Sequence, residues 1–93
     1  MVSGKAIIKN NAGIHVRPSG VIYTAVKDYQ GTIRLSGNGM DVDLGGLMGL
    51  IAMGLCRGNG VKIEVTGPDE KQKCEQLVEL FERVYDFSGR EQG

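Results

Sequence analysis

The sequence predicts an α+β fold of the open-faced β-sandwich type, in which helices cover one face of a sheet. Three observations lead to this prediction. Several short segments alternate apolar and polar residues, which is typical of half-buried strands. Other segments repeat apolar residues with the helical period, and an Asn-Gly pair joins two of the strand segments. The resulting order is β-α-β-β-α-β-α in a single domain, residues 1–93.

The first strand and helix flank a turn. The apolar run Lys5–Lys9 predicts a strand, and the turn-forming residues 10–13 end it. A helix is predicted over Pro18–Tyr29, since proline suits the first helical turn and Gly31 ends the segment. The apolar positions with helical spacing are Val21, Ile22, Ala25 and Tyr29.

The centre of the chain predicts a hairpin, and a strand and a helix follow. Segments 32–36 and 40–44 alternate with period two on either side of Asn38-Gly39, which is the strongest short-range hairpin signal. A weak helix is expected over Leu47–Met53, a strand over Val61–Thr66, and a long helix with Pro68 at its first position. The core face of that last helix is predicted to contain Cys74, Leu77, Val78, Phe81, Val84 and Tyr85.

Composition excludes several classes of protein. Eleven basic and eleven acidic residues cancel, which argues against nucleic-acid binding. The two cysteines, Cys56 and Cys74, are too few for a disulfide scaffold, and Cys74 is expected to be a buried thiol. The longest apolar stretch is interrupted by glycines and too short to span a bilayer, and the N-terminus does not resemble a signal peptide. We therefore expect a cytoplasmic protein without membrane insertion.

The chain has a single histidine, His15, which stands directly before the first predicted helix. A helix N-terminus carries free N–H groups and roughly half a positive charge, so the N–H groups of Val16 and Arg17 favour a bound anion such as phosphate. The Arg17 guanidinium can pair with two phosphoryl oxygens. Both positive features disfavour the imidazolium and keep the ring neutral and nucleophilic near neutral pH. The sequence therefore predicts that His15 accepts and holds a phosphoryl group.

Other interpretations of His15 are a surface residue, a metal ligand or part of a hydrolase. A lone histidine before a helix is usually a surface residue or an imperfect cap. No second histidine or cysteine lies at a metal-binding interval, so no metal site and no cofactor are predicted. A nucleophile elbow is missing, and a domain of this size has little room for an enclosed cleft. The pattern favours a phosphoryl carrier over a free-standing enzyme.

A second candidate site is the glycine-rich apolar segment 44–54. Wound as a helix, the segment has two apolar sides. One side contains Leu47, Met48 and Ile51, and the other contains Leu50 and Met53. One side can enter the core, and an exposed side with methionine would be typical of a docking surface. The alternative is that a tightly wrapped core buries both sides.

The residues Gly13-Ile14-His15-Val16-Arg17-Pro18-Ser19 resemble the active-site signature of HPr, the histidine-containing phosphocarrier of the bacterial phosphoenolpyruvate-dependent sugar phosphotransferase system. The resemblance covers nearly the whole chain. It includes Asn38-Gly39, Leu47-Met48-Gly49 with the later Gly54, and Gly67-Pro68-Asp69-Glu70. It implies a four-stranded antiparallel sheet with three helices on one face, in agreement with the pattern.

The resemblance also implies partners and residue roles. Enzyme I, phosphorylated by phosphoenolpyruvate, would pass the phosphoryl group to Nδ1 of His15 with the assistance of Arg17. The phosphohistidine would then donate to a histidine of an EIIA-type domain. Leu47, Met48 and Ile51 would form the docking surface shared by these partners. A monomer is expected, and regulatory proteins are further candidate partners.

One position departs from the family pattern. Many members from bacteria with a dedicated HPr kinase have a regulatory serine at the start of the second helix. This chain has Gly46 there, and Gly45 precedes it. The sequence therefore predicts that serine phosphorylation does not control the protein at this position.

Two alternatives to a sugar-uptake carrier differ in class. A regulatory phosphorelay module, as in the nitrogen-related carriers, would use the same histidine without serving sugar transport, and the sequence does not separate the two. An RNA-binding α+β domain is disfavoured, because the predicted strands contain no Phe, Tyr or Trp for base stacking.

Overall fold

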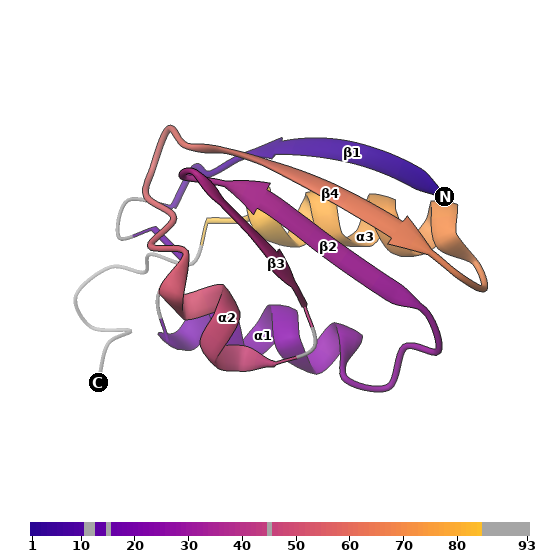
Figure 1. Ribbon diagram of the computed structural model, residues 1–93. Helices are drawn as coiled ribbons and strands as arrows, with labels where there is room; N and C mark the ends of the chain where they lie inside the picture. The colour runs from indigo at the N-terminus through magenta and orange to yellow at the C-terminus, as the bar shows by residue number, and fades with distance from the viewer. Residues whose placement is uncertain (11–12, 15, 45, 85–93) are drawn as a thin grey trace.

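The computed structural model describes residues 1–10, 13–14, 16–44 and 46–84, without the side chains of Val16 and Arg17. The predictions for His15, Gly45 and Tyr85 lie outside the described residues. The elements follow the predicted order. They are β1 (Val2–Ile7), α1 (Val16–Val26), β2 (Thr32–Gly37), β3 (Met40–Asp43), α2 (Leu47–Ala52), β4 (Gly60–Thr66) and α3 (Glu70–Glu82) (Figure 1).

The four strands form one antiparallel sheet in the order β1-β4-β2-β3. The register places Leu35 of β2 opposite Ile63 of β4 on one side and Val42 of β3 on the other. The three helices cover a single face of this sheet (Figure 1). The predicted open-faced α+β sandwich is therefore confirmed.

Alternation along β4 creates the core face of the sheet. Val61, Ile63 and Val65 are fully buried, whereas Lys62 between the first two is exposed. On β1, Gly4 permits α3 to approach closely, because a Cβ at that position would lie 3.0 Å from Cys74 Sγ. Burial raises the pKa of the Cys74 thiol, in keeping with its predicted role as a small hydrophobe.

Several predicted boundaries and faces are wrong. The first strand is Val2–Ile7 rather than Lys5–Lys9, because it pairs with β4 along its whole length, from Val2 opposite Val65 onward. The next residue, Ile8, is buried but lies outside the strand. The first helix begins before Pro18, which lies in its first turn as expected, and ends at Val26.

One predicted core residue, Val84, and one apolar residue of the first helical pattern, Val21, are exposed. Val21 in α1 is 37% exposed and Val84, just beyond α3, is 53% exposed. Helix α3 ends at Glu82, so Val84 does not continue its helical face. Leu80, which was not among the predicted core residues, is buried beside Leu77 and Phe81.

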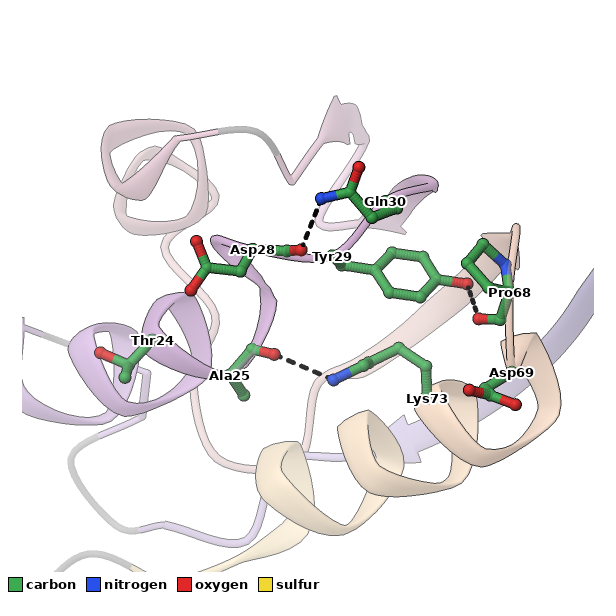
Figure 2. Close-up of a pocket in the computed structure, with 8 residues that line it drawn as sticks. All are labelled: Thr24, Ala25, Asp28, Tyr29, Gln30, Pro68, Asp69 and Lys73. Carbon is green, nitrogen blue, oxygen red and sulfur yellow. Dashed lines mark hydrogen bonds between the residues drawn. The ribbon is translucent and has the colours of Figure 1, made fainter.

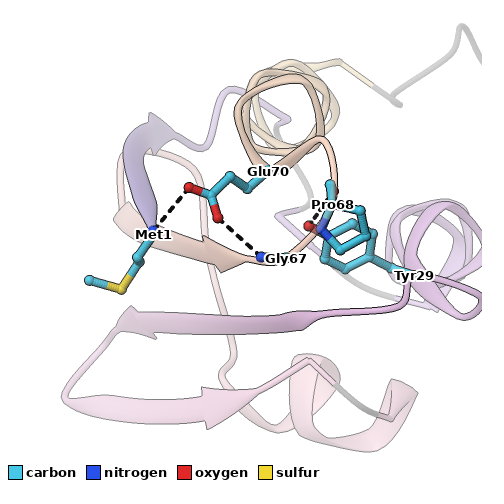
Figure 3. A network of polar contacts seen from close by, with 5 residues as sticks. All are labelled: Met1, Tyr29, Gly67, Pro68 and Glu70. Carbon is cyan, nitrogen blue, oxygen red and sulfur yellow. Dashed lines mark hydrogen bonds and ion pairs between the residues drawn. The ribbon is translucent and has the colours of Figure 1, made fainter.

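The start of α3 also differs from the prediction. Pro68 precedes the helix, because Asp69 adopts a left-handed backbone with φ of 49° and α3 begins at Glu70. The Tyr29 hydroxyl donates to the Pro68 carbonyl at 2.7 Å. The Glu70 carboxylate accepts from the Gly67 N–H at 3.1 Å and pairs with the amino group of Met1 at 2.9 Å (Figure 3). Glu70 thus binds the main chain before the helix, whereas the N-cap Asp69 makes no side-chain cap hydrogen bond.

We expect Glu70→Gln to make the free energy of unfolding less dependent on pH in the acidic range. The amino group of Met1, followed by the Gly67 N–H, lowers the pKa of Glu70 below its ordinary 4.5. A lowered carboxyl pKa stabilises the fold above the unfolded value, and this contribution is lost as pH falls through the folded value. Urea denaturation at several pH values below 4.5 measures the slope. Glu75→Gln, an exposed glutamate of α3, is the control, and an equal change in both variants would contradict the assignment.

Candidate functional site

In the segment that leads to His15, the peptide group between Gly13 and Ile14 is hydrogen-bonded at both its carbonyl and its N–H. The Gly13 carbonyl accepts a hydrogen bond from Asn10 Nδ2 at 2.8 Å, and the Ile14 N–H donates to the Leu55 carbonyl at 2.8 Å. The Gly13 N–H also donates to the Asn10 carbonyl at 2.9 Å, which closes a turn. The side chains of Asn10 and Ile14 are buried. The backbone entering position 15 is therefore anchored to the interior.

Gly13 is required by this geometry. Its φ is +74°, in the region that favours glycine. A Cβ there would collide with the Leu55 carbonyl oxygen and lie 3.1 Å from the Cα of Cys56. Only a residue without a side chain therefore lets this turn lie against the segment that follows α2.

Helix α1 begins at Val16, so residue 15 immediately precedes a helix N-terminus, as predicted. His15 itself lies outside the described residues, and the side chain of Arg17 is not described. The first turn contains no acidic residue. Its free N–H groups and positive helix end can therefore receive an anion without a carboxylate in the same turn that would repel it.

Ser19 is a buried polar residue that the sequence pattern does not predict. Its side chain is fully buried in α1, and its hydroxyl has no hydrogen-bond partner within the described part of the chain. Buried hydroxyl groups are normally paired. A serine next to Pro18 in a helical turn has no sequence signal that distinguishes this environment from an exposed one.

Helix α2 presents its two sides as the helical pattern predicts. Leu50 and the following Met53 are buried in the core. On the other side Met48 is 73% exposed, and Leu47 and Ile51 are half-buried. We call Leu47, Met48 and Ile51 the α2 patch. It lies on a helix that packs against α1 (Figure 1).

The ends of α2 have different support. Gly46 is the N-cap, with an extended backbone and no side-chain cap. At the other end Asn38 Nδ2, from the β2–β3 turn, donates to the carbonyls of Met53 and Gly54, at 2.9 Å each. The chain then reaches Leu55, whose carbonyl holds Ile14. The hydrogen bond from the Ile14 N–H to the Leu55 carbonyl thus joins the segment before His15 to the segment that follows α2.

Helix α1 has a surface hollow at its other end. The hollow has a volume of about 350 Å³ and lies between the end of α1 and the start of α3 (Figure 2). Lys73 Nζ crosses it to donate to the Ala25 carbonyl at 2.9 Å. It is separated from Val16 by the length of the helix, so it is not part of the site next to His15.

The described residues supply three further observations. Among them, His, Cys, Asp and Glu form no group of three or more that could hold a metal ion. No helix in the described ranges is long and apolar enough to cross a membrane. Cys56, close to Gly13, is exposed and unpaired with another cysteine in this part of the structure.

Comparison with known proteins gives consistent matches in sequence and fold. The profile of the family described as "PTS HPr component phosphorylation site" matches residues 2–83. The chain is 34% identical over 82 residues to the phosphocarrier protein HPr of Borreliella burgdorferi, with 88% of this chain and 95% of that protein covered. It is 28% identical over 83 residues to the phosphocarrier protein NPr of Proteus mirabilis, with 88% and 92% covered.

A solved structure supports the same relationship. HPr-C-His from Thermoanaerobacter tengcongensis matches with a TM-score of 0.79 and 28% identity. The match covers 87% of this chain and 91% of that one.

Proposed function

Because this chain belongs to the HPr family of the phosphotransferase system, we propose that it carries a phosphoryl group on Nδ1 of His15 and passes it to a second protein. The observation that supports this assignment is the start of α1 at Val16, directly after the histidine. The helix end favours the phosphoryl dianion and disfavours the imidazolium.

The transfer needs only exchange of one phosphorus–nitrogen bond for another. Neutral Nδ1 of His15 attacks the phosphorus of a phosphohistidine on the donor, and the donor's phosphorus–nitrogen bond breaks. The donor imidazole leaves with the bonding electron pair and takes up a proton, while the His15 ring releases the proton that its other nitrogen carried. Arg17 and the N–H groups of Val16 and Arg17 stabilise the charge on the transferring phosphoryl oxygens. The reverse exchange with an acceptor histidine restores the free carrier.

The partners we propose are enzyme I as donor and EIIA-type domains as acceptors, within the cytoplasm. A sugar-uptake relay is the first candidate for this single-domain monomer. The similarity to NPr of Proteus mirabilis favours a nitrogen-related regulatory relay as the second. Gly46 at the N-cap of α2 offers no hydroxyl for a serine kinase.

The carrier chemistry is tested by incubating the purified protein with enzyme I, Mg²⁺ and phosphoenolpyruvate. Gain of one acid-labile phosphoryl group in the intact mass is expected, and no gain with a competent enzyme I would overturn the proposal. The phosphorylated protein is then offered to a sugar-type and to a nitrogen-type EIIA protein. Faster loss of phosphate to the sugar-type acceptor supports the first candidate, and the reverse order supports the second.

The α2 patch gives a separate prediction about partner binding. Met48→Glu is expected to weaken association with enzyme I by about tenfold or more, because a charge would be buried in an apolar contact. Its stability should change by no more than about 0.5 kcal/mol, since Met48 is 73% exposed. Thr32→Glu adds the same charge at an exposed position at the start of β2 and serves as the control. Titration calorimetry measures the affinity of each variant for enzyme I, and urea denaturation measures its stability. Equal binding by Met48→Glu and wild type would show that Met48 is not part of the interface.

A further inference from the structure

Asn10 is a buried polar residue outside the phosphocarrier signature, and its amide has a defined task. The side chain is fully buried, and Nδ2 donates to the Gly13 carbonyl at 2.8 Å. Only the amide nitrogen can make this bond, since a carbonyl oxygen accepts and does not donate. The main chain of Asn10 accepts from the Gly13 N–H in the same turn.

The bond acts on the peptide group between Gly13 and Ile14. The carbonyl of that group is held by Asn10 and its N–H by the Leu55 carbonyl, at 2.8 Å each. A planar peptide group held at both its carbonyl and its N–H has little freedom to rotate. The buried side chain of Ile14 adds a third constraint. The direction in which the chain continues to residue 15 therefore depends on Asn10.

We infer that Asn10 is a positioning residue for phosphoryl transfer, which orients the Gly13–Ile14 peptide and thereby the nucleophile two residues beyond Gly13. This inference rests on the proposed function of His15. In-line attack on phosphorus is sensitive to geometry, and a misplacement of about 1 Å can slow an enzymatic reaction by about a hundredfold. Asn10 touches neither the donor nor the phosphoryl group in this assignment and acts through the backbone.

The test separates the rate of transfer from the binding of the donor. Single-turnover transfer from phosphorylated enzyme I is followed over a range of carrier concentrations for wild type, Asn10→Ala and Asn10→Ser. The limiting rate of Asn10→Ala is expected to fall by about tenfold or more, whereas the half-saturating concentration changes by less than about twofold. Serine has a shorter donor that can bond within its own turn, so partial rescue is expected.

A matched control distinguishes positioning from loss of stability. Val65→Ala truncates a fully buried side chain near the end of β4, where Val65 pairs with Val2 of β1. It should destabilise the fold while leaving the limiting rate of transfer unchanged. A folded Asn10→Ala variant that transfers at the wild-type rate would overturn the inference. If Asn10→Ala does not fold, Asn10→Ser decides the matter, because partial rescue predicts a limiting rate below that of wild type and an unchanged rate would overturn the inference.

Hydrogen exchange tests the structural premise without any phosphoryl transfer. In Asn10→Ala the Ile14 amide is expected to exchange about fivefold to tenfold faster, relative to the amides of β4, because its peptide group loses one of its two hydrogen bonds. Unchanged protection of Ile14 would refute the role of Asn10 even if His15 is phosphorylated. Failure of the wild-type protein to accept phosphate would instead refute the proposed function and leave the exchange result standing.

Discussion

Replacement of His15 by alanine is expected to abolish phosphoryl uptake from phosphorylated enzyme I while the protein remains folded. The chain contains no other histidine, so no second imidazole can replace the lost nucleophile. The preceding segment is held by the hydrogen bonds of Asn10 to Gly13 and of Ile14 to Leu55. The free energy of unfolding should therefore change by no more than about 1 kcal/mol.

The intact mass after incubation with enzyme I and phosphoenolpyruvate measures this effect, and urea denaturation measures the stability. Arg17→Ala supplies the contrast, because it retains the nucleophile and should slow the reaction without preventing it. An acid-labile phosphoryl group on His15→Ala would show that another residue is the acceptor. Unfolding of the variant would show that the histidine belongs to the core.

Gly13→Ala is expected to cause a large loss of stability. Alanine at a φ of +74° is strained by about 1–2 kcal/mol. Its Cβ would also collide with the Leu55 carbonyl oxygen, which is the acceptor for the Ile14 N–H. Relief of the collision must move the turn and weaken that hydrogen bond, at a further cost of about 1–3 kcal/mol.

Gly39→Ala is a matched control for the backbone strain. Gly39 has the same φ of +74°, but no heavy atom lies within 4 Å of its hypothetical Cβ. Urea denaturation of the two variants should show that Gly13→Ala is less stable by about 2 kcal/mol. Equal losses would mean that the turn can move away from Leu55 at little cost, and the anchoring of the segment before His15 would then be weaker than its contacts indicate.

The elements with strong local signals could be predicted from the sequence. Asn38 and Gly39 have φ of 50° and 74°, as a tight hairpin turn requires, and the two strands begin where the alternation begins. The division of α2 into a buried side with Leu50 and an exposed side with Met48 also follows from spacing alone. These features depend on residues close together in the chain.

The features that the sequence does not predict depend on contacts between distant segments. The residues 10–13 predict a turn, but the burial of Asn10 depends on the fold around it. Pro68 has the signal of a first helical residue, yet its carbonyl binds Tyr29 from the turn after α1 and the helix starts later. Asn38 forms the hairpin turn and also donates hydrogen bonds to the carbonyls at the end of α2. These hydrogen bonds likewise depend on how the hairpin packs. Helical periodicity placed Val84 in the core because it does not indicate where a helix ends.

The place of β1 in the sheet has a consequence for how the protein is made. Within the described residues β1 pairs with β4 alone, although β1 is synthesised well before β4, which begins at Gly60. A ribosome adds roughly 5–20 residues per second, so the N-terminal strand waits a few seconds before its partner exists. The sheet therefore cannot close until β4 has left the ribosome. Nascent chains that stall before Gly60 contain the whole segment before α1 but lack β4, the strand that completes the fold. Such chains should be sensitive to proteases.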